Sequence, residues 1–148
     1  MIIEVIAAFF VAYGFGILFN IKGKYLLLSG IAGSIGWFAY KLCLYFGRSE
    51  NLAYFVAAVS FSIFCQICAI KFHTPYTILS ICALIPLVPG YGVYNSMYQF
   101  LTGNYIKAID YGVNTLSSAG SLALGVILVS SIFRTKKGLR HIFKDIRK

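Results

Sequence analysis

The sequence predicts an all-α integral membrane protein with five transmembrane helices. Of its 148 residues, 59% are hydrophobic and 11% are charged, whereas a soluble domain typically carries about 25% charged residues. Five apolar runs lie near the length of roughly 20 residues that crosses a bilayer: 2–19, 25–46, 52–70, 76–101 and 111–133. Short polar links separate the runs, so we expect one transmembrane domain over residues 1–133, with neighbouring helices antiparallel.

Charge placement supports an odd number of spans and sets an orientation. With five crossings, ten of the thirteen basic residues share one side of the membrane: Lys22, Lys24, Lys71, Arg134, Lys136, Lys137, Arg140, Lys144, Arg147 and Lys148. The other side carries Glu4, Glu50 and Asp110. Because cytoplasmic loops are rich in Lys and Arg, we predict a multi-pass protein of the cytoplasmic (inner) membrane, with its N-terminus outside and its C-terminus cytoplasmic.

The first apolar run, residues 2–19, is interpreted as a permanent helix. A cleaved signal peptide begins with a basic segment, whereas this chain begins MIIEVIAAFF and carries Glu4. The run ends at Asn20, before a Lys-Gly-Lys turn. It therefore counts as the first of the five spans.

Small residues mark two packing faces. They recur at helical spacing: Gly30, Gly33 and Gly36 in the second predicted helix, and Ser117, Ser121 and Gly125 in the fifth. Small side chains let membrane helices approach closely and gain dispersion contacts, because lipid supplies no hydrophobic drive for association. These faces pack either within the chain or against a second membrane protein.

The third predicted helix contains no chemistry that we assign to function. Its Cys65 and Cys68 share a face, but buried cysteines behave as small hydrophobic residues. We therefore expect no metal site and no disulfide framework.

Neither His73 nor His141 has a nearby acidic or thiol partner in an apolar run, so we expect no enzymatic activity and no cofactor.

The fourth apolar run is interrupted by the stretch IPLVPGYGVYN, which begins at Ile85. Pro86 and Pro89 cannot donate backbone hydrogen bonds to the preceding turn, and Gly90 and Gly92 follow them. We therefore predict a helix break between Pro86 and Gly90, near the middle of the span. Unpaired carbonyls are costly in lipid, so the break must face protein or a water-filled cavity.

The half-helix that restarts after the break is the predicted substrate site. Its first N–H groups and its positive dipole end suit a carboxylate, an arrangement found in transporters with broken helices. The candidate substrate-binding residues of this stretch are Pro86, Pro89, Gly90, Tyr91, Tyr94 and Asn95. In the fifth helix, Asn114 and Ser118 either bind substrate or form hydrogen bonds between helices. A proline kink that only shapes packing is the alternative for the break.

Residues 134–148 form a basic tail. Leu139, Ile142, Phe143 and Ile146 follow i, i+3, i+4, i+7 spacing, with basic residues between them. This pattern predicts a short amphipathic helix that lies on anionic lipid headgroups or on a partner. The net charge is +9, and most of the basic residues lie on the predicted cytoplasmic side, as the positive-inside rule requires. We therefore expect no nucleic-acid binding.

Four segments occur in a recognisable order and spacing: GFGILFN from Gly14, GSIGW from Gly33, IPLVPGYGVYNSM from Ile85, and NTLSSAGSLALG from Asn114. Together they resemble the threonine/serine exporter family, and more closely its small split membrane subunit, the YjjB type. The resemblance spans most of the chain, and the proline-glycine break is its most specific part. It implies one five-helix half of a two-component secondary exporter, whose larger subunit carries a soluble domain and the other half.

The resemblance also implies a substrate class, namely small carboxylate-bearing metabolites, with threonine or serine first. The alternatives are a subunit of a dicarboxylate (succinate-type) exporter, a non-transporting assembly subunit and a homo-oligomeric channel. The expected partners are the larger membrane subunit, membrane lipids and the carboxylate substrate, and a higher oligomer is left open.

Overall fold

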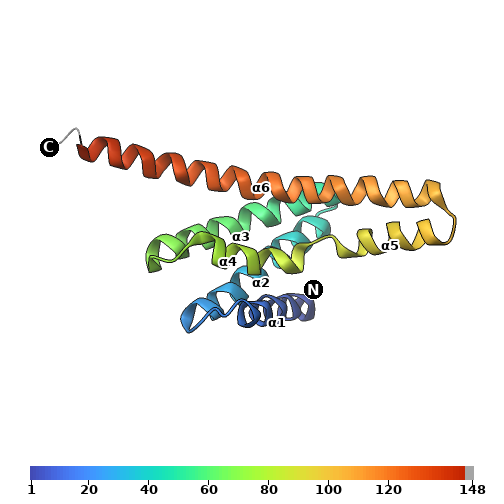
Figure 1. Ribbon diagram of the computed structural model, residues 1–148, viewed down its shortest axis with the longest axis horizontal. Helices are drawn as coiled ribbons and strands as arrows, with labels where there is room; N and C mark the ends of the chain where they lie inside the picture. The colour runs from blue at the N-terminus through green and yellow to red at the C-terminus, as the bar shows by residue number, and fades with distance from the viewer. Residues whose placement is uncertain (146–148) are drawn as a thin grey trace.

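The computed structural model is all-helical over its described part, which comprises the backbone of residues 1–145 and the side chains of residues 1–134 (Figure 1). The helices, in chain order, are α1 (Ile2–Leu18), α2 (Lys24–Tyr45), α3 (Glu50–Phe72), α4 (Tyr76–Leu84), α5 (Gly90–Leu101) and α6 (Tyr105–Asp145), with a 3₁₀ turn, η1 (Ile85–Leu87), between α4 and α5. The predicted all-α class is therefore confirmed.

The number of membrane spans is three or four by length and composition. In the described part of the chain, α2, α3 and Tyr105–Arg134 of α6 are each long and apolar enough to cross a membrane. The segment Tyr76–Leu87, which comprises α4 and η1, forms a fourth candidate with α5, and the two parts are bent by 49° at the break. α1 is apolar but has only 17 residues, so the fifth predicted span stays a prediction.

The predicted break in the fourth helix is confirmed. The α-helix ends at Leu84, the 3₁₀ turn ends at Leu87, and α5 begins at Gly90. Pro86 lies against the middle of α2, where its Cγ is 3.5 Å from the Cβ position of Gly33. Since prolines cannot donate a backbone hydrogen bond, the helical ladder stops here and restarts after Pro89.

The start of the last helix differs from the sequence prediction. α6 begins at Tyr105, six residues before the predicted start at 111, so Asp110 lies within the helix instead of at its edge. The amide of Ala108 donates to the carbonyl of Asn104 at 3.0 Å, which closes the first turn. The predicted start was taken from hydropathy, which marks only the apolar part of a helix. A helix can also begin with polar residues if its first turn is hydrogen-bonded, so the prediction wrongly left residues 105–110 out of the helix.

The basic tail begins inside the same helix. The backbone of α6 continues through Arg134 to Asp145 without a break. Residues 135–148 lie outside those with described side chains, so the amphipathic face formed by Leu139, Ile142, Phe143 and Ile146 stays a prediction.

Small residues bring the helices together within the chain. A Cβ at Gly33 would lie 2.6 Å from Ala12 Cβ of α1, and one at Gly36 would lie 2.8 Å from Leu87 of η1. At Gly30 the nearest atom is Phe9 Cε2 of α1, at 2.7 Å, and Gly125 approaches α3 in the same way. Such close backbone approach is how membrane helices gain packing energy. These four glycines therefore lie at contacts between helices of this one chain.

The buried core is centred on α3, which packs against α2, α4 and α6. Its buried residues are mostly small, apart from Tyr54 and the fully buried Phe61: Ala53, Tyr54, Ala57, Ala58, Phe61, Ser62, Cys65 and Cys68. Because the side chains are small, the neighbouring helices pack closely against α3. α3 is therefore the central helix of the bundle.

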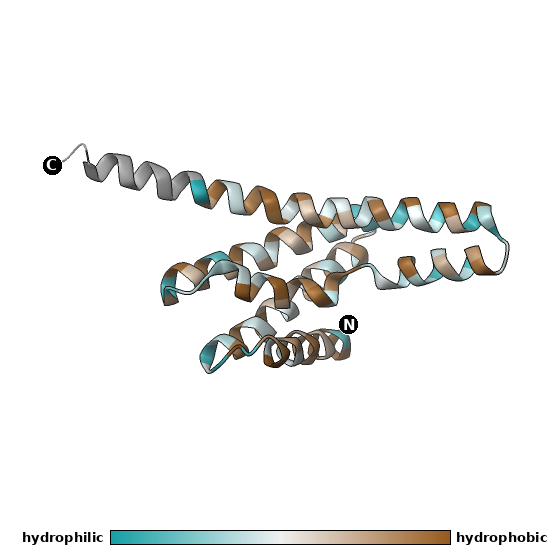
Figure 2. Ribbon diagram, in the orientation of Figure 1, coloured by the Kyte–Doolittle hydropathy of each residue, from teal (hydrophilic) through white to brown (hydrophobic). Residues whose placement is uncertain are grey.

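Polar side chains mark two ends of the bundle, and Figure 2 shows hydrophilic residues gathered at the turns. The Glu50 end carries Glu4, Lys41, Glu50 and Asn51, and the Lys71 end carries Lys22, Lys24, Lys71 and Arg134. From Asn51 to Lys71, α3 rises about 30 Å at roughly 1.5 Å per residue. This rise matches the thickness of a bilayer core, about 30 Å.

α5 and the first turns of α6 extend beyond the Glu50 end (Figure 1). Asn51 of α3 contacts α6 at Ser117 and Ser118, so residues 105–116 rise about 18 Å past this level. No residue of α5 is buried against the described part of the chain. We call α5 together with residues 105–116 the projecting hairpin.

Candidate functional site

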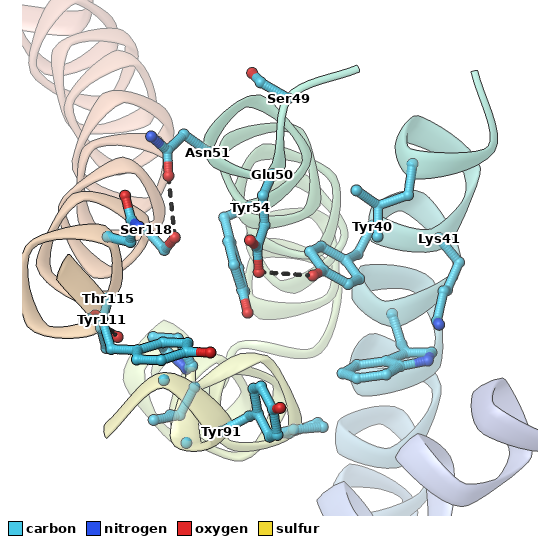
Figure 3. A pocket seen from close by; sticks show the side chains of 18 residues that line it. Tyr40, Lys41, Ser49, Glu50, Asn51, Tyr54, Tyr91, Tyr111, Thr115 and Ser118 are labelled. Carbon is cyan, nitrogen blue, oxygen red and sulfur yellow. Dashed lines mark hydrogen bonds between the residues drawn. The ribbon is translucent and has the colours of Figure 1, made fainter. Parts of the chain in front are cut away.

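A cavity of about 710 Å³ lies at the helix break, near the Glu50 end of the bundle (Figure 3). Its walls come from the second half of α2, the start of α3, the break itself and the part of α6 that passes α3. The lining residues are Trp37, Tyr40, Lys41, Leu44, Ser49, Glu50, Asn51, Tyr54, Pro86, Val88, Pro89, Gly90, Tyr91, Gly92, Tyr111, Asn114, Thr115 and Ser118. Four segments that are distant in the sequence therefore build one site.

The break forms one wall of the cavity. The amide of Val88 donates to Ile85 O at 3.2 Å, and the amide of Gly90 donates to Val88 O at 2.7 Å. At the start of α5, the amide of Val93 donates to Pro89 O at 3.4 Å, one helical turn earlier. The first N–H groups of a helix have no carbonyl acceptor within it, so the start of α5 brings backbone donors to the cavity wall.

α5 and α6 approach closely beside this wall. A Cβ at Gly92 would collide with the side chain of Thr115, whose Oγ1 is its nearest atom and whose Cβ would be 3.2 Å away. The Thr115 hydroxyl donates to Tyr111 O at 2.6 Å, which holds this side chain along α6. Glycine at position 92 therefore lets the half-helix lie directly against α6.

The cavity brings together six of the eight predicted substrate-binding residues: Pro86, Pro89, Gly90, Tyr91, Asn114 and Ser118. Tyr94 and Asn95 do not line it. Tyr94 stacks on Tyr98 with ring centroids 6.2 Å apart, and Asn95 Nδ2 donates to Tyr91 O of its own helix at 2.9 Å. Both lie on the projecting hairpin, beyond the cavity, and a role for any of the eight in binding stays a prediction.

Ser118 takes part in hydrogen bonds between helices. Its hydroxyl donates to Asn51 Oδ1 at 3.0 Å, and Asn51 Nδ2 donates to Ser117 Oγ at 2.8 Å. Ser121 donates to Ser117 O within α6 at 3.0 Å. The side chain of Asn114 makes no hydrogen bond to a described residue. Its amide group is therefore available to a ligand in the cavity.

The sequence prediction missed the charged residues of the site, Lys41 and Glu50. Lys41 Nζ lies 2.8 Å from Glu4 Oε2 of α1, and Trp37 Nε1 donates to the same oxygen at 3.3 Å. On the neighbouring wall, the Tyr40 hydroxyl donates to Glu50 Oε1 at 3.4 Å. The cavity therefore carries a cation and an anion that are not paired with each other.

Aromatic side chains separate these two charges. Tyr40 packs against Tyr54 with ring centroids 4.7 Å apart and against Trp37 at 5.5 Å, and Figure 3 shows Tyr40 between Lys41 and Glu50. Trp37, Tyr40, Lys41 and Leu44 follow i, i+3, i+4, i+7 spacing, so one face of α2 lines the cavity. That spacing is the sequence signal that could have indicated this wall.

The arrangement suits a small ligand that carries both charges. An ammonium group offers three hydrogen-bond donors, and Glu4 is the anion within reach of Lys41, so other donors of Lys41 can bind a ligand carboxylate. Glu50 can accept hydrogen bonds from a ligand cation. Among the residues with described side chains, no group of three His, Cys, Asp or Glu residues could hold a metal ion.

Comparisons with known proteins point to one family. Residues 4–132 match the family described as "Threonine/Serine exporter, ThrE". A protein of Corynebacterium glutamicum with the name "Threonine/serine exporter" is 29% identical over 109 residues, which make up 73% of this chain and 22% of that protein. The chain thus spans about a fifth of the length of this relative. No solved structure matches the chain.

Proposed function

Because the chain belongs to the threonine/serine exporter family, we propose that it is the membrane subunit of a two-component secondary exporter for small carboxylate-bearing metabolites, with threonine or serine as the substrate. The single observation that carries this proposal is the cavity at the helix break, whose walls hold Lys41 and Glu50. The substrate binds in this cavity on its way across the membrane.

Opposite charges in one cavity favour an amino acid over a dicarboxylate. Lys41 and the first N–H groups of α5 attract a carboxylate, and helix N-termini stabilise anions in the same way. Glu50 attracts an ammonium group and repels a second carboxylate, and specificity depends on such repulsion as much as on attraction. A zwitterion such as threonine satisfies both walls, whereas succinate leaves Glu50 facing an anion.

α1 completes a five-span membrane domain in this proposal. Its 17 residues rise about 26 Å, close to the thickness of a bilayer core, and Ala8, Ala12 and Gly16 are buried on one face. Lys22 and Lys24 follow its C-terminal end. The positive-inside rule then places the Lys71 end in the cytoplasm and the cavity near the outer surface of the inner membrane.

A larger membrane subunit completes the exporter. The chain corresponds to about a fifth of the length of the relative from Corynebacterium glutamicum, so most of such a protein has no counterpart in this chain. The projecting hairpin exposes Tyr94, Met97 and Leu101 at 65%, 66% and 76%, and no described residue covers them. In this proposal, a second membrane protein of the same family covers this surface.

The test is transport by vesicles that contain the purified chain with any subunit that co-purifies. Export of radiolabelled threonine and of succinate is measured for the wild type and for Glu50→Gln. A hydrogen bond to a charged group contributes about 1.5–3 kcal/mol, so threonine export is expected to fall about tenfold or more in the variant. Asp110→Asn is the matched control, because Asp110 lies on the projecting hairpin and does not line the cavity.

Four results would contradict this proposal, each in a different way. Undiminished threonine export by Glu50→Gln would remove Glu50 from the site, and wild-type export of succinate without threonine would establish the dicarboxylate alternative. Transport by this chain alone, as a homo-oligomer, would establish the channel. Loss of assembly with unchanged transport per complex in Met97→Ala, whose side chain is exposed on the projecting hairpin, would identify a scaffold.

A further inference from the structure

A second cavity, of about 420 Å³, lies at the Lys71 end of the bundle, away from the helix break. It is bounded by the end of α1, the turn that leads to α2, and the first turns of α4. Its walls include Phe19, Lys22, Thr74, Thr77, Ile78 and Ile81. We call it the α1–α4 groove. None of its residues lines the cavity at the break, so it is a separate site.

The groove changes from polar to apolar along its length. Lys22 and Thr74 belong to the two turns at the Lys71 end, and Thr77 lies in the first turn of α4. Ile81 follows Thr77 by four residues, which is about 6 Å further toward the centre of the bundle. Ile78 and Ile81 remain 39% and 49% exposed. A phospholipid has the same order of polarity, with a polar headgroup followed by apolar acyl chains.

Lys22 is the cation that the groove can offer to an anion. Lys24 Nζ lies 4.6 Å from the ring centroid of Phe72, and Lys71 Nζ lies 5.8 Å from the same centroid. Among the described side chains, Lys22 has neither an ion-pair partner nor an aromatic ring beneath it. Its ammonium group is therefore not committed to the protein.

Two hydroxyl groups line the groove together with this cation. The Thr74 and Thr77 hydroxyls donate no hydrogen bond to any residue in the described part of the chain, although Tyr25, which also lines the groove, donates to Phe72 O at 3.3 Å. Both hydroxyls are therefore available to a ligand that offers acceptor oxygens. A phosphate oxygen satisfies both hydroxyls and pairs with Lys22.

We propose that the α1–α4 groove is a binding site for one anionic phospholipid. The phosphate lies between Lys22 and the hydroxyls of Thr74 and Thr77, and one acyl chain lies along Ile78 and Ile81. A free anion would leave the apolar wall exposed, and a zwitterionic lipid would bring a second cation, such as choline, close to Lys22, which repels it. Basic pockets between membrane helices bind anionic headgroups for this reason.

The experiment is native mass spectrometry of the purified full chain, with any subunit that co-purifies, after incubation with equal amounts of dioleoylphosphatidylglycerol and dioleoylphosphatidylcholine. One retained phosphatidylglycerol per chain is expected, in preference to phosphatidylcholine. In Lys22→Gln, retention of phosphatidylglycerol should fall about fivefold. Lys107→Gln is the matched control, because Lys107 lies on the projecting hairpin, far from the groove.

A second variant tests the apolar half of the site. Ile81→Trp fills the groove and should lower retention of both lipids, and the thermal midpoint measured without lipid shows whether the variant is folded. Equal retention of the two lipids by the wild type would overturn the proposal. Unchanged phosphatidylglycerol retention in Lys22→Gln, or the same loss in Lys107→Gln, would overturn it as well.

Discussion

Gly125 of α6 allows α3 and α6 to pack closely, because glycine has no side chain between the two helices. A Cβ at this position would lie 2.6 Å from Ala58 Cβ and 2.9 Å from the carbonyl oxygen of Phe55. The second neighbour is backbone and cannot rotate away. In Gly125→Ala, the two helices must therefore separate until these contacts reach ordinary distances, which begin at 3.4 Å.

The same substitution at Gly120 separates this cost from the effect of alanine itself. Gly120 lies in the same helix, and no described atom lies within 4 Å of its Cβ position. In both variants, alanine favours the helix by about 1 kcal/mol relative to glycine. Only Gly125→Ala adds the cost of overpacking, about 1–3 kcal/mol. The difference in stability between the two variants therefore measures the contact.

The assay is thermal unfolding of the two variants in the same detergent, followed by the fluorescence of Trp37, the single tryptophan. A change of 1 kcal/mol shifts the midpoint of a chain of this size by about 2–4 °C. Gly125→Ala should therefore unfold roughly 5 °C below Gly120→Ala. Equal midpoints would refute the close approach of α3 and α6 at this position.

Two further predictions concern the walls of the cavity at the helix break. Asn51→Ala removes both hydrogen bonds that join α3 to Ser117 and Ser118. Such bonds average about 0.6 kcal/mol each in membranes, so the thermal midpoint should fall by a few degrees relative to Asn114→Ala, which removes a side chain that makes no hydrogen bond to a described residue. Gly92→Ala brings a methyl group onto Thr115 and should lower the midpoint, and the second substitution Thr115→Ala should restore at least half of the loss. A double variant no more stable than Gly92→Ala would show that the two residues do not meet.

The sequence was most informative where backbone chemistry decides the structure. Pro86 and Pro89 stop a helical ladder whatever surrounds them, so the break could be placed to within a residue or two. Gly33 and Gly125 could be assigned to packing because only small residues admit close approach. Six of the predicted substrate-binding residues line one cavity for the same reason, since they belong to the break or to the helix beside it.

The remaining part of the site depends on tertiary contacts. Lys41 and Glu50 stood out in the sequence only as charges at the ends of apolar runs, and only the folded chain brings them to the break. Tyr94 and Asn95 share a helix with Tyr91, but they lie about one turn further along it, beyond the cavity. Helical spacing could not indicate how far along α5 the cavity extends, because that depends on where the neighbouring helices end.

The backbone at Val88 and Pro89 joins two parts of the chain that are held in different ways. α5 is fastened to α6, because the Ser96 hydroxyl donates to Ala108 O at 2.8 Å and Gly112 lies against Ser96, whereas no residue of α5 is buried by the described part of the chain. The hairpin is therefore held mainly through α6, and α6 in turn packs against α3. A partner that binds the exposed tip would act on the cavity through this packing, so the contacts between α3 and α6 would have to change before the cavity could widen or narrow.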